Sequence, residues 1–400
     1  MVKSVKSLLC LILSSILTVS FVGCASTADT TQTTAGGTTQ QSTVQLTTAT
    51  DDTVPQTTEQ PTYNFNKIKQ NSDNIKTTFD QLLVNNKFRG AVYVRLGNDF
   101  EYVGTNGFSN KEQHTSNSVN TCYRVGSVTK QFTATAIMML QEQGKLSTDD
   151  TIDKYFSSYK YADKITIKNL LTMTSGIKDY MTQDGEIDSS VYLLSQLEYS
   201  VSAKNSASKN KQAIMDWIFD QKLNFEPGEK YMFSNSGYFL LGDIIEKVSG
   251  MSYEKFITEN ILKPLDMNST SFEKTDSLAT GYQDIYDNEW TLYPGVSYSS
   301  SGLISNIADL LKWVEAFTDN EIISEESFEE MTTSYVGNYG YGFFVEGNTL
   351  SQKGKSEKFN SKLAFEKDES SIYIALSNYT QSDPTELISE MVASIKPFYG

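Results

Sequence analysis

A serine and a lysine three positions apart are the residues of this sequence best suited to chemistry. They stand in Ser127-Val128-Thr129-Lys130, before a run with helical periodicity that ends at Gly144. A serine hydroxyl is a weak nucleophile at neutral pH and needs a nearby base. Because residues i and i+3 share one helix face, Lys130 is placed to take the proton of Ser127. The exposed N–H groups of a first helical turn also favour the anion that results.

The spacing alone is weak evidence, because Ser-x-x-Lys begins at several other serines of the chain. The residues that follow distinguish Ser127. Residues 131–144 carry apolar side chains at helical spacing, which predicts a largely buried helix. Burial lowers the pKa of a lysine, so Lys130 in the first turn of such a helix is suited to act as a base.

Residues 1–62 are predicted to lie outside the folded part. Lys3 and Lys6 precede an uncharged stretch, which predicts a secretory signal over 1–24. The stretch ends in Phe21-Val22-Gly23-Cys24, which resembles the lipobox of bacterial lipoproteins with phenylalanine where leucine is usual. That resemblance implies a lipid on Cys24 and anchoring to the outer face of the bacterial cell membrane. The alternative is an ordinary cleaved signal with an incidental cysteine.

Residues 25–62 are mostly Thr, Ser, Gln, Ala and Gly, with no Lys, Arg or aromatic residue. Such a segment buries too little apolar surface to offset its ordering entropy, so a disordered linker is predicted. It would serve as a tether for the domain that follows, or be a disordered tail without that role. The folded domain is therefore expected to span 63–400.

The charge and the cysteine content exclude several classes of function. A formal net charge of −16 argues against nucleic acid and anionic lipid surfaces as partners. His114 is the single histidine, so a Ser-His-Asp triad or a zinc site of several His and Cys is not expected. Cys122 is the one cysteine of the predicted domain and has no internal disulfide partner. We expect neither a metal nor another cofactor.

The two ends of the domain carry strand patterns and the middle carries helix patterns. A helix is predicted over 64–86, followed by strands Gly90–Leu96 and Phe100–Gly104 with a turn between them. The later strands are Tyr341–Val345, Thr349–Gly354, Ser361–Phe365 and Ser371–Ser377, before a helix Pro384–Lys396. The helices between them are Ile167–Thr172, Lys211–Phe219, Tyr238–Val248, Tyr253–Ile261 and Ile307–Phe317. This order predicts an α/β (α+β) fold: one antiparallel sheet built from both ends of the domain, flanked by helices, with an inserted, mostly helical subdomain.

Several longer segments resemble one family. They are Tyr-Arg-Val-Gly-Ser-Val-Thr-Lys-Gln-Phe-Thr-Ala (123–134), Gly-Lys-Leu-Ser-Thr-Asp-Asp (144–150), Ile-Lys-Asn-Leu-Leu-Thr-Met-Thr-Ser-Gly-Ile (167–177), Pro-Gly-Glu-Lys-Tyr-Met-Phe-Ser-Asn-Ser-Gly-Tyr-Phe-Leu-Leu-Gly (227–242), Ser-Ser-Ser-Gly-Leu-Ile-Ser-Asn-Ile-Ala-Asp-Leu (299–310) and Tyr-Gly-Tyr-Gly-Phe-Phe (339–344). In this order they resemble the serine β-lactamase-related family of class C β-lactamases, D-alanyl-D-alanine carboxypeptidases and esterases. The resemblance covers about 75–380 and implies the β-lactamase/penicillin-binding-protein-like fold. It is more specific for the fold than for the substrate.

The family brings three motifs together in one cleft, and this chain matches the first. The resemblance implies that Ser127 is acylated and that Lys130 is the base or proton relay. The second motif is usually Tyr-x-Asn, and here it is Phe233-Ser234-Asn235. Asn235 can hydrogen-bond the lysine and an acyl amide, but Phe233 cannot carry a proton. Tyr231 would replace the phenol only if the local register shifted.

The third motif is usually His or Lys, any residue, then Gly, and the best match is Gln352-Lys353-Gly354. A neutral amide therefore stands where the family has a cation for the substrate's carboxylate. Side chains alternate along a strand, so Lys353 should point to the opposite face. The resemblance implies an oxyanion hole made by the backbone N–H groups of Ser127 and Lys355.

The sequence thus predicts an extracytoplasmic serine hydrolase that forms an acyl-enzyme on an ester, amide or peptide, with cell-wall peptides among the candidates. With two motifs altered, weak or no β-lactamase activity is expected. The first alternative is a catalytically impaired family member that acts as a cell-surface binding or scaffolding lipoprotein. The second is a structural or adhesive lipoprotein without chemistry.

Overall fold

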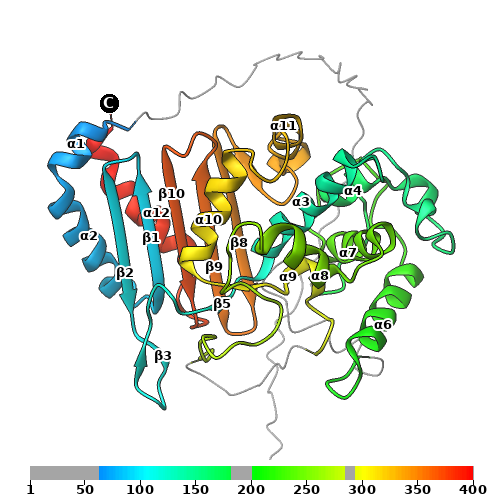
Figure 1. The fold of residues 1–400 in the computed structure, drawn as a ribbon, viewed down its shortest axis with the longest axis horizontal. Coiled ribbons are helices and arrows are strands. Elements are labelled where there is room, and N and C mark those ends of the chain that lie inside the picture. The colour runs from blue at the N-terminus through cyan, green and yellow to red at the C-terminus, as the bar shows by residue number, and fades with distance from the viewer. Residues whose placement is uncertain (1–62, 182–200, 284–292, 400) are drawn as a thin grey trace, which may run out of the picture. The chain divides into compact units, whose positions relative to one another are not determined.

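The protein is built on one six-stranded antiparallel sheet, with strand order β2-β1-β10-β9-β8-β7 (Figure 1). This computed structural model describes residues 63–181, 201–283 and 293–399, so the predicted signal, the linker and Cys24 lie outside the described residues. The strands are β1 (Gly90–Leu96), β2 (Phe100–Asn106), β7 (Phe344–Glu346), β8 (Thr349–Ser356), β9 (Phe359–Glu366) and β10 (Ser371–Ser377). The predicted sheet from both ends of the domain is confirmed.

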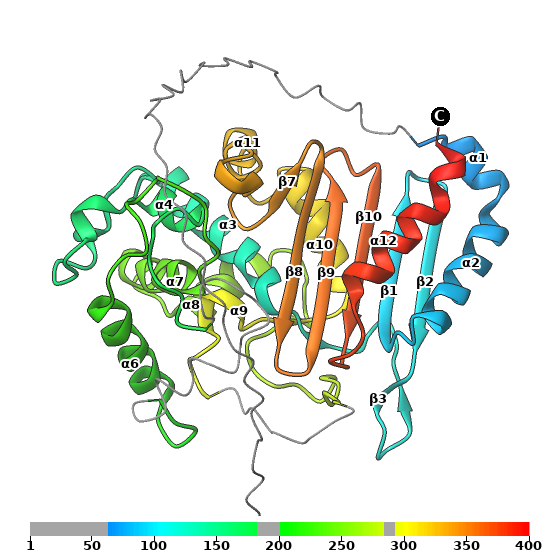
Figure 2. The same cartoon turned by 180° about the vertical axis from the view of Figure 1, so that it is seen from behind.

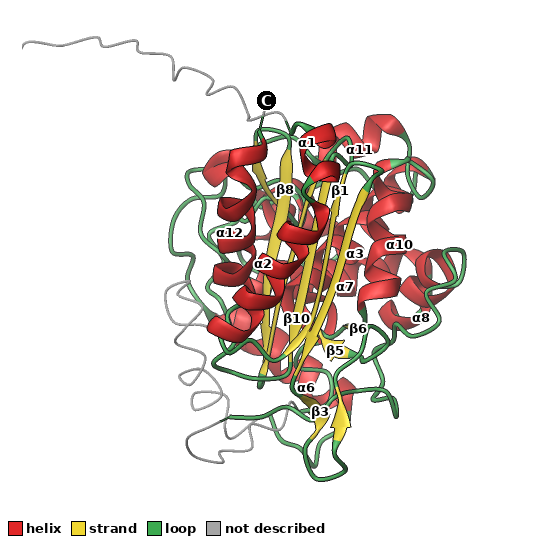
Figure 3. Cartoon of the chain, turned by 90° about the vertical axis from the view of Figure 1, so that its left-hand side faces the viewer, coloured by secondary structure: helices red, strands yellow, loops and turns green. Residues whose placement is uncertain are grey.

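Helices cover both faces of the sheet (Figure 3). On one face lie α1 (Phe65–Gln70), α2 (Ser72–Asn85) and α12 (Pro384–Ile395), and on the other lie α3 (Thr129–Glu142) and α10 (Ile307–Thr318). The central strands β1 and β10 are consequently buried on both faces, whereas β2 at one edge alternates buried and exposed residues. Figure 2 shows α12 crossing the back of the sheet.

The predicted helix over 64–86 is wrong at one point, because Asn71 divides it into α1 and α2. Asn71 has φ −109° and ψ 15°, and its side-chain nitrogen donates to the Lys67 carbonyl, 2.8 Å away. A short amide side chain that bonds nearby backbone competes with helix continuation, which explains the break.

The middle of the chain forms the predicted helical region. Its helices are α4 (Ile167–Leu171), α6 (Ala207–Asp220), α7 (Asn235–Ser249), α8 (Tyr253–Ile257), α9 (Tyr298–Ser301) and α11 (Glu325–Met331). Small strand pairs are β3 (Phe108–Asn110) with β4 (Thr115–Ser116), and β5 (Tyr123–Arg124) with β6 (Ile304–Ser305). Two predicted elements differ in their bounds. The helix predicted over Tyr253–Ile261 is α-helical only in α8 and continues as a π-helical turn over Thr258–Leu262. The strand predicted over Tyr341–Val345 begins only at Phe344, as β7.

No helix in the described ranges is both long and apolar enough to cross a membrane.

Candidate active site

Ser127 lies in a 3-10 turn, Gly126–Val128, that leads directly into α3. Gly126 has φ +52°, and a Cβ there would lie 2.6 Å from the backbone nitrogen of Lys355 on β8. A side chain at this position would therefore be strained and would also clash with the strand. Glycine lets the turn that carries Ser127 pack directly on β8.

Lys130, in the first turn of α3, is fully buried and donates three hydrogen bonds. Its Nζ lies 2.9 Å from Ser127 Oγ, 2.8 Å from Asn235 Oδ1 and 2.9 Å from the Ser300 carbonyl. The predicted meeting of serine, lysine and asparagine is thus observed. Burial lowers the pKa of Lys130 to about 7, while the charge of Asp179 acts in the opposite direction. A substantial fraction of this lysine is therefore neutral, and able to accept a proton, near neutral pH.

Phe233 occupies the place predicted for it, beside the lysine. Its ring centroid lies 5.0 Å from Lys130 Nζ, and that of Tyr238 on α7 lies 5.6 Å away. Tyr231 instead packs on Tyr339, with ring centroids 5.7 Å apart. The register has not shifted, so the position above the lysine is apolar. The two aromatic rings contribute to the desolvation of the ammonium group.

The third motif lies on β8 with its side chains alternating as predicted. Gln352 is buried and Lys353 is exposed on the opposite face. The Gln352 side-chain nitrogen donates to the Lys353 carbonyl at 2.8 Å, and the Tyr339 hydroxyl lies 3.5 Å from its oxygen. A Cβ on Gly354 would lie 2.1 Å from the Val125 carbonyl oxygen. The glycine is therefore required by the close approach of β8 to the segment before Ser127.

The backbone of Lys355 lies against Gly126, as the contact described above shows. Its N–H is thus close to the turn that carries Ser127, although its part in an oxyanion hole stays a prediction. The hairpin that follows is tied to β5, because Arg124 forms an ion pair with Glu357 at 3.4 Å. This contact fixes the end of β8 relative to the chain that enters the nucleophile turn.

Sequence reasoning missed two groups of this site. Asp179 is buried, and its Oδ2 accepts from the backbone nitrogen of Asn235 at 3.2 Å and from its side-chain nitrogen at 3.0 Å. The Ser300 carbonyl is the other missed group. Ser300 lies within a segment that carries the family resemblance and Asp179 lies two residues after one, but neither residue type signals a role at that position.

Cys122 is buried, and desolvation raises the pKa of its thiol to about 11. It is therefore a packed small residue and no reactive thiol.

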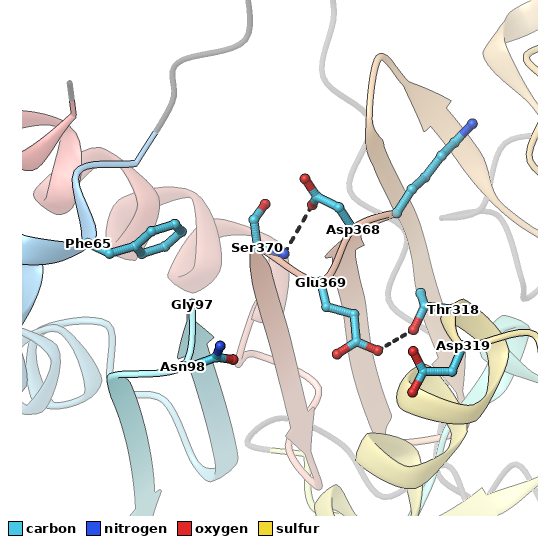
Figure 4. Close-up of a pocket in the computed structure, with 9 residues that line it drawn as sticks. Phe65, Gly97, Asn98, Thr318, Asp319, Asp368, Glu369 and Ser370 are labelled. Carbon is cyan, nitrogen blue, oxygen red and sulfur yellow. Dashed lines mark hydrogen bonds between the residues drawn. The ribbon is translucent and has the colours of Figure 1, made fainter.

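The surface pocket in Figure 4 lies at a different place, near the β1–β2 and β9–β10 turns. Glu369 accepts a hydrogen bond from Thr318 there, and Asp368 accepts from the Ser370 backbone. None of the predicted site residues lines this pocket. In the described ranges, no three His, Cys, Asp or Glu side chains are grouped so as to hold a metal ion.

Known proteins are similar to this chain in sequence and in fold. The family model described as Beta-lactamase matches residues 75–392. The protein named "Putative penicillin-binding protein PbpX" of Bacillus subtilis (strain 168) is 31% identical over 324 residues, covering 78% of this chain and 77% of the relative. Penicillin-binding protein 4* of the same strain is 29% identical over 316 residues, covering 72% of this chain and 66% of the relative, so the match spans just under two thirds of that protein.

Solved structures with the same fold include a penicillin binding protein from Bacillus halodurans, with a TM-score of 0.70 and 23% identity over 79% of this chain and 99% of that one. The D-amino acid amidase from Ochrobactrum anthropi SV3 has a TM-score of 0.65 at 20% identity, covering 82% and 99%. At these identities the likeness concerns the fold alone. Together with the match to the family model, these findings show that the chain belongs to the Beta-lactamase family.

Proposed function

We propose that this chain is a serine hydrolase that forms an acyl-enzyme on Ser127. The observation that carries the proposal is the 2.9 Å contact between Ser127 Oγ and the fully buried Nζ of Lys130. Neutral Lys130 takes the hydroxyl proton as Oγ attacks the substrate carbonyl. The backbone N–H groups of Ser127 and Lys355 stabilise the oxyanion. The leaving group then departs with the proton from the lysine, and the acyl group remains on Oγ as an ester.

Deacylation repeats these steps with water. Water gives a proton to Lys130 as it attacks the ester, and that proton returns to Ser127 Oγ when the acid leaves. Phe233 offers no phenol, and the Tyr238 hydroxyl donates to the Leu171 carbonyl at 2.9 Å, so in this proposal Lys130 carries both transfers. Loss of a general acid–base group costs about 10²–10⁴-fold in rate, so slow turnover is expected.

The substrate proposed is an ester, amide or peptide, with cell-wall peptides among the candidates. Gln352 places a neutral amide at this position of β8, so recognition of a substrate carboxylate by a cation there is lost. Weak or no β-lactamase activity follows. The names of the penicillin-binding relatives, and of the D-amino acid amidase that shares the fold, support acyl transfer as the class of reaction.

A second candidate is a binding or scaffolding protein that is acylated without turnover. Phe233 favours it, because the missing phenol affects the release of the acyl group as well as its formation. For either function we propose attachment to the outer face of the bacterial cell membrane through a lipid on Cys24. The support for this is the signal-like start of the sequence and the lipobox resemblance.

Labelling with a fluorescent penicillin and with a fluorophosphonate probe tests the proposal. Wild type should be labelled and Ser127→Ala should not. Ser157→Ala is the matched control, because Ser157 also begins a Ser-x-x-Lys sequence but is exposed, and this variant should label like wild type. A p-nitrophenyl ester, whose acyl group water can remove, separates the candidates by intact mass over time: an acyl adduct that disappears indicates a hydrolase, and one that persists indicates an acylated binding protein. Absence of any adduct on wild type would refute both.

A further inference from the structure

Asp179 is a buried carboxylate to which the proposed reaction assigns no step. It lies in the segment after α4, which is hydrogen-bonded to the first turn of α7. The backbone nitrogen of Tyr180 donates to Ser236 Oγ at 3.0 Å, and that hydroxyl donates to the Lys178 carbonyl at 2.7 Å. The carboxylate is thereby held at the N-terminus of α7, where the helix dipole favours a negative charge.

Both oxygens of Asp179 accept hydrogen bonds. Oδ1 accepts from the Met181 backbone nitrogen at 2.7 Å, and Oδ2 accepts from the backbone and side-chain nitrogens of Asn235. An ionised carboxylate only accepts, so the side of the Asn235 amide that faces it must be the nitrogen. The amide oxygen is then the atom left to face Lys130. A flipped amide would set oxygen against carboxylate and N–H against ammonium, and both contacts would be repulsive.

We propose that Asp179 is a positioning residue for the acylation reaction: its carboxylate fixes the orientation of the Asn235 amide, and its negative charge acts on Lys130 across that amide. This inference rests on the proposed function, since it concerns the same lysine. It assigns a role in the chemistry to a residue that does not itself touch the reacting atoms.

Three phenols lie close to Lys130 or to the residues that surround it. Tyr238 faces it from α7, and Tyr253 of α8 lies one turn along α3, hydrogen-bonded to Thr133 at 2.7 Å. The Tyr180 hydroxyl oxygen lies 3.2 Å from Ser300 Oγ on α9. Burial raises the pKa of each of these phenols well above its usual range. From β8 the motif presents an amide and a glycine; the charged residues nearby are Lys355, whose backbone lies against Gly126, and the Arg124–Glu357 ion pair.

Asp179→Asn removes the charge and keeps the size of the side chain. The lysine should then lose its proton more readily. In the pH profile of the acylation rate, the acid limb, where the rate falls as Lys130 becomes protonated, should therefore move to lower pH by about one unit. The maximal rate should fall by about tenfold or more, because an amide at 179 no longer dictates the orientation of Asn235. Asp179→Glu keeps the charge, so its acid limb should stay near that of wild type even if its maximal rate falls. The measurement is the rate of fluorophosphonate labelling of the full chain from acid to mildly alkaline pH.

A titration that needs no reaction separates this inference from the proposed function. The ¹³C signal of the Lys130 side chain, assigned by comparison with Lys130→Met, reports the ionisation directly in wild type and Asp179→Asn.

A shift to lower pH in both measurements supports the proposal. A lower labelling rate with an unchanged acid limb and an unchanged lysine titration would mean that Asp179 is merely structural, and would overturn it. If wild type is never labelled but the lysine titration still shifts, the proposed function fails while the effect of Asp179 on Lys130 stands. If Asp179→Asn does not fold, Asp179→Ser is the neutral substitute, and an unchanged titration in that variant overturns the proposal as well.

Discussion

Replacing Lys130 by methionine tests whether burial has lowered the pKa of this lysine. The pKa is about 7 in the folded protein, whereas a lysine in an unfolded chain titrates near about 10.4. Between these values the unfolded chain binds one more proton than the folded protein, so the free energy of unfolding of wild type rises with pH. At lower pH both states are protonated and the full cost of burying the ammonium is present. At higher pH both states are neutral and that cost has gone.

The expected slope is about 1.4 kcal/mol per pH unit, or roughly 3 kcal/mol over two units within this window. Methionine has a similar length but no titrating group, so Lys130→Met lacks this slope. The variant also loses the three hydrogen bonds to Ser127, Asn235 and Ser300. Their loss costs about 1–3 kcal/mol each, but this cost is nearly independent of pH. The change in the stability difference with pH therefore isolates the ionisation of the lysine.

The assay is urea unfolding of wild type and Lys130→Met at several values from about pH 7.5 to 9.5, followed by tryptophan fluorescence. The stability of wild type relative to the variant should increase steadily over this range. Lys145→Met is the control. Lys145 is exposed, so the difference in the free energy of unfolding between that variant and wild type should not change with pH. A flat difference for Lys130→Met as well would refute the reasoning. It would show that the lysine stays charged through the neutral range and is not available as a base there.

Two further substitutions test the altered motif and the close approach of β8. Phe233→Tyr places a phenol beside Lys130 and should raise steady-state hydrolysis of a p-nitrophenyl ester by about 10²-fold; an unchanged rate would contradict the view that a proton carrier is missing at this position. Gly354→Ala puts a methyl group 2.1 Å from the Val125 carbonyl oxygen and 2.3 Å from Ser361 Oγ. It should destabilise the fold by about 1–3 kcal/mol and abolish labelling, as measured by urea unfolding and the fluorophosphonate probe. Wild-type stability together with wild-type labelling would show that β8 is free to move away from the turn.

Local patterns predicted the parts of the site that depend on local structure. Helical spacing after Ser127 correctly placed Lys130 at the start of a buried helix, and alternation along a strand separated the faces of Gln352 and Lys353. The break at Asn71 was missed because apolar periodicity continues through it, while one side-chain hydrogen bond ends the first helix.

The groups that complete the lysine environment could not be found in this way. Asp179 and the Ser300 carbonyl reach Lys130 or its partner from segments distant in the chain, through tertiary packing. A backbone carbonyl has no residue signature, and an aspartate in a loop usually faces water. Sequence patterns therefore predicted that Ser127 and Lys130 lie together, but not the groups that hold the lysine in place.

The pairing of β1 with β10 has a consequence for the synthesis of this chain. Gly90 lies opposite Ser377, so this strand pair cannot form until the chain has been synthesised through Ser377. The turn that carries Ser127 packs on β8, which is also synthesised long after the turn. Contacts between residues so far apart in sequence also form slowly, because the entropy of closing a long loop must be overcome first. The turn that carries Ser127 therefore meets its strand only after β8 has been synthesised, and a chain that stops before β8 should not be acylated.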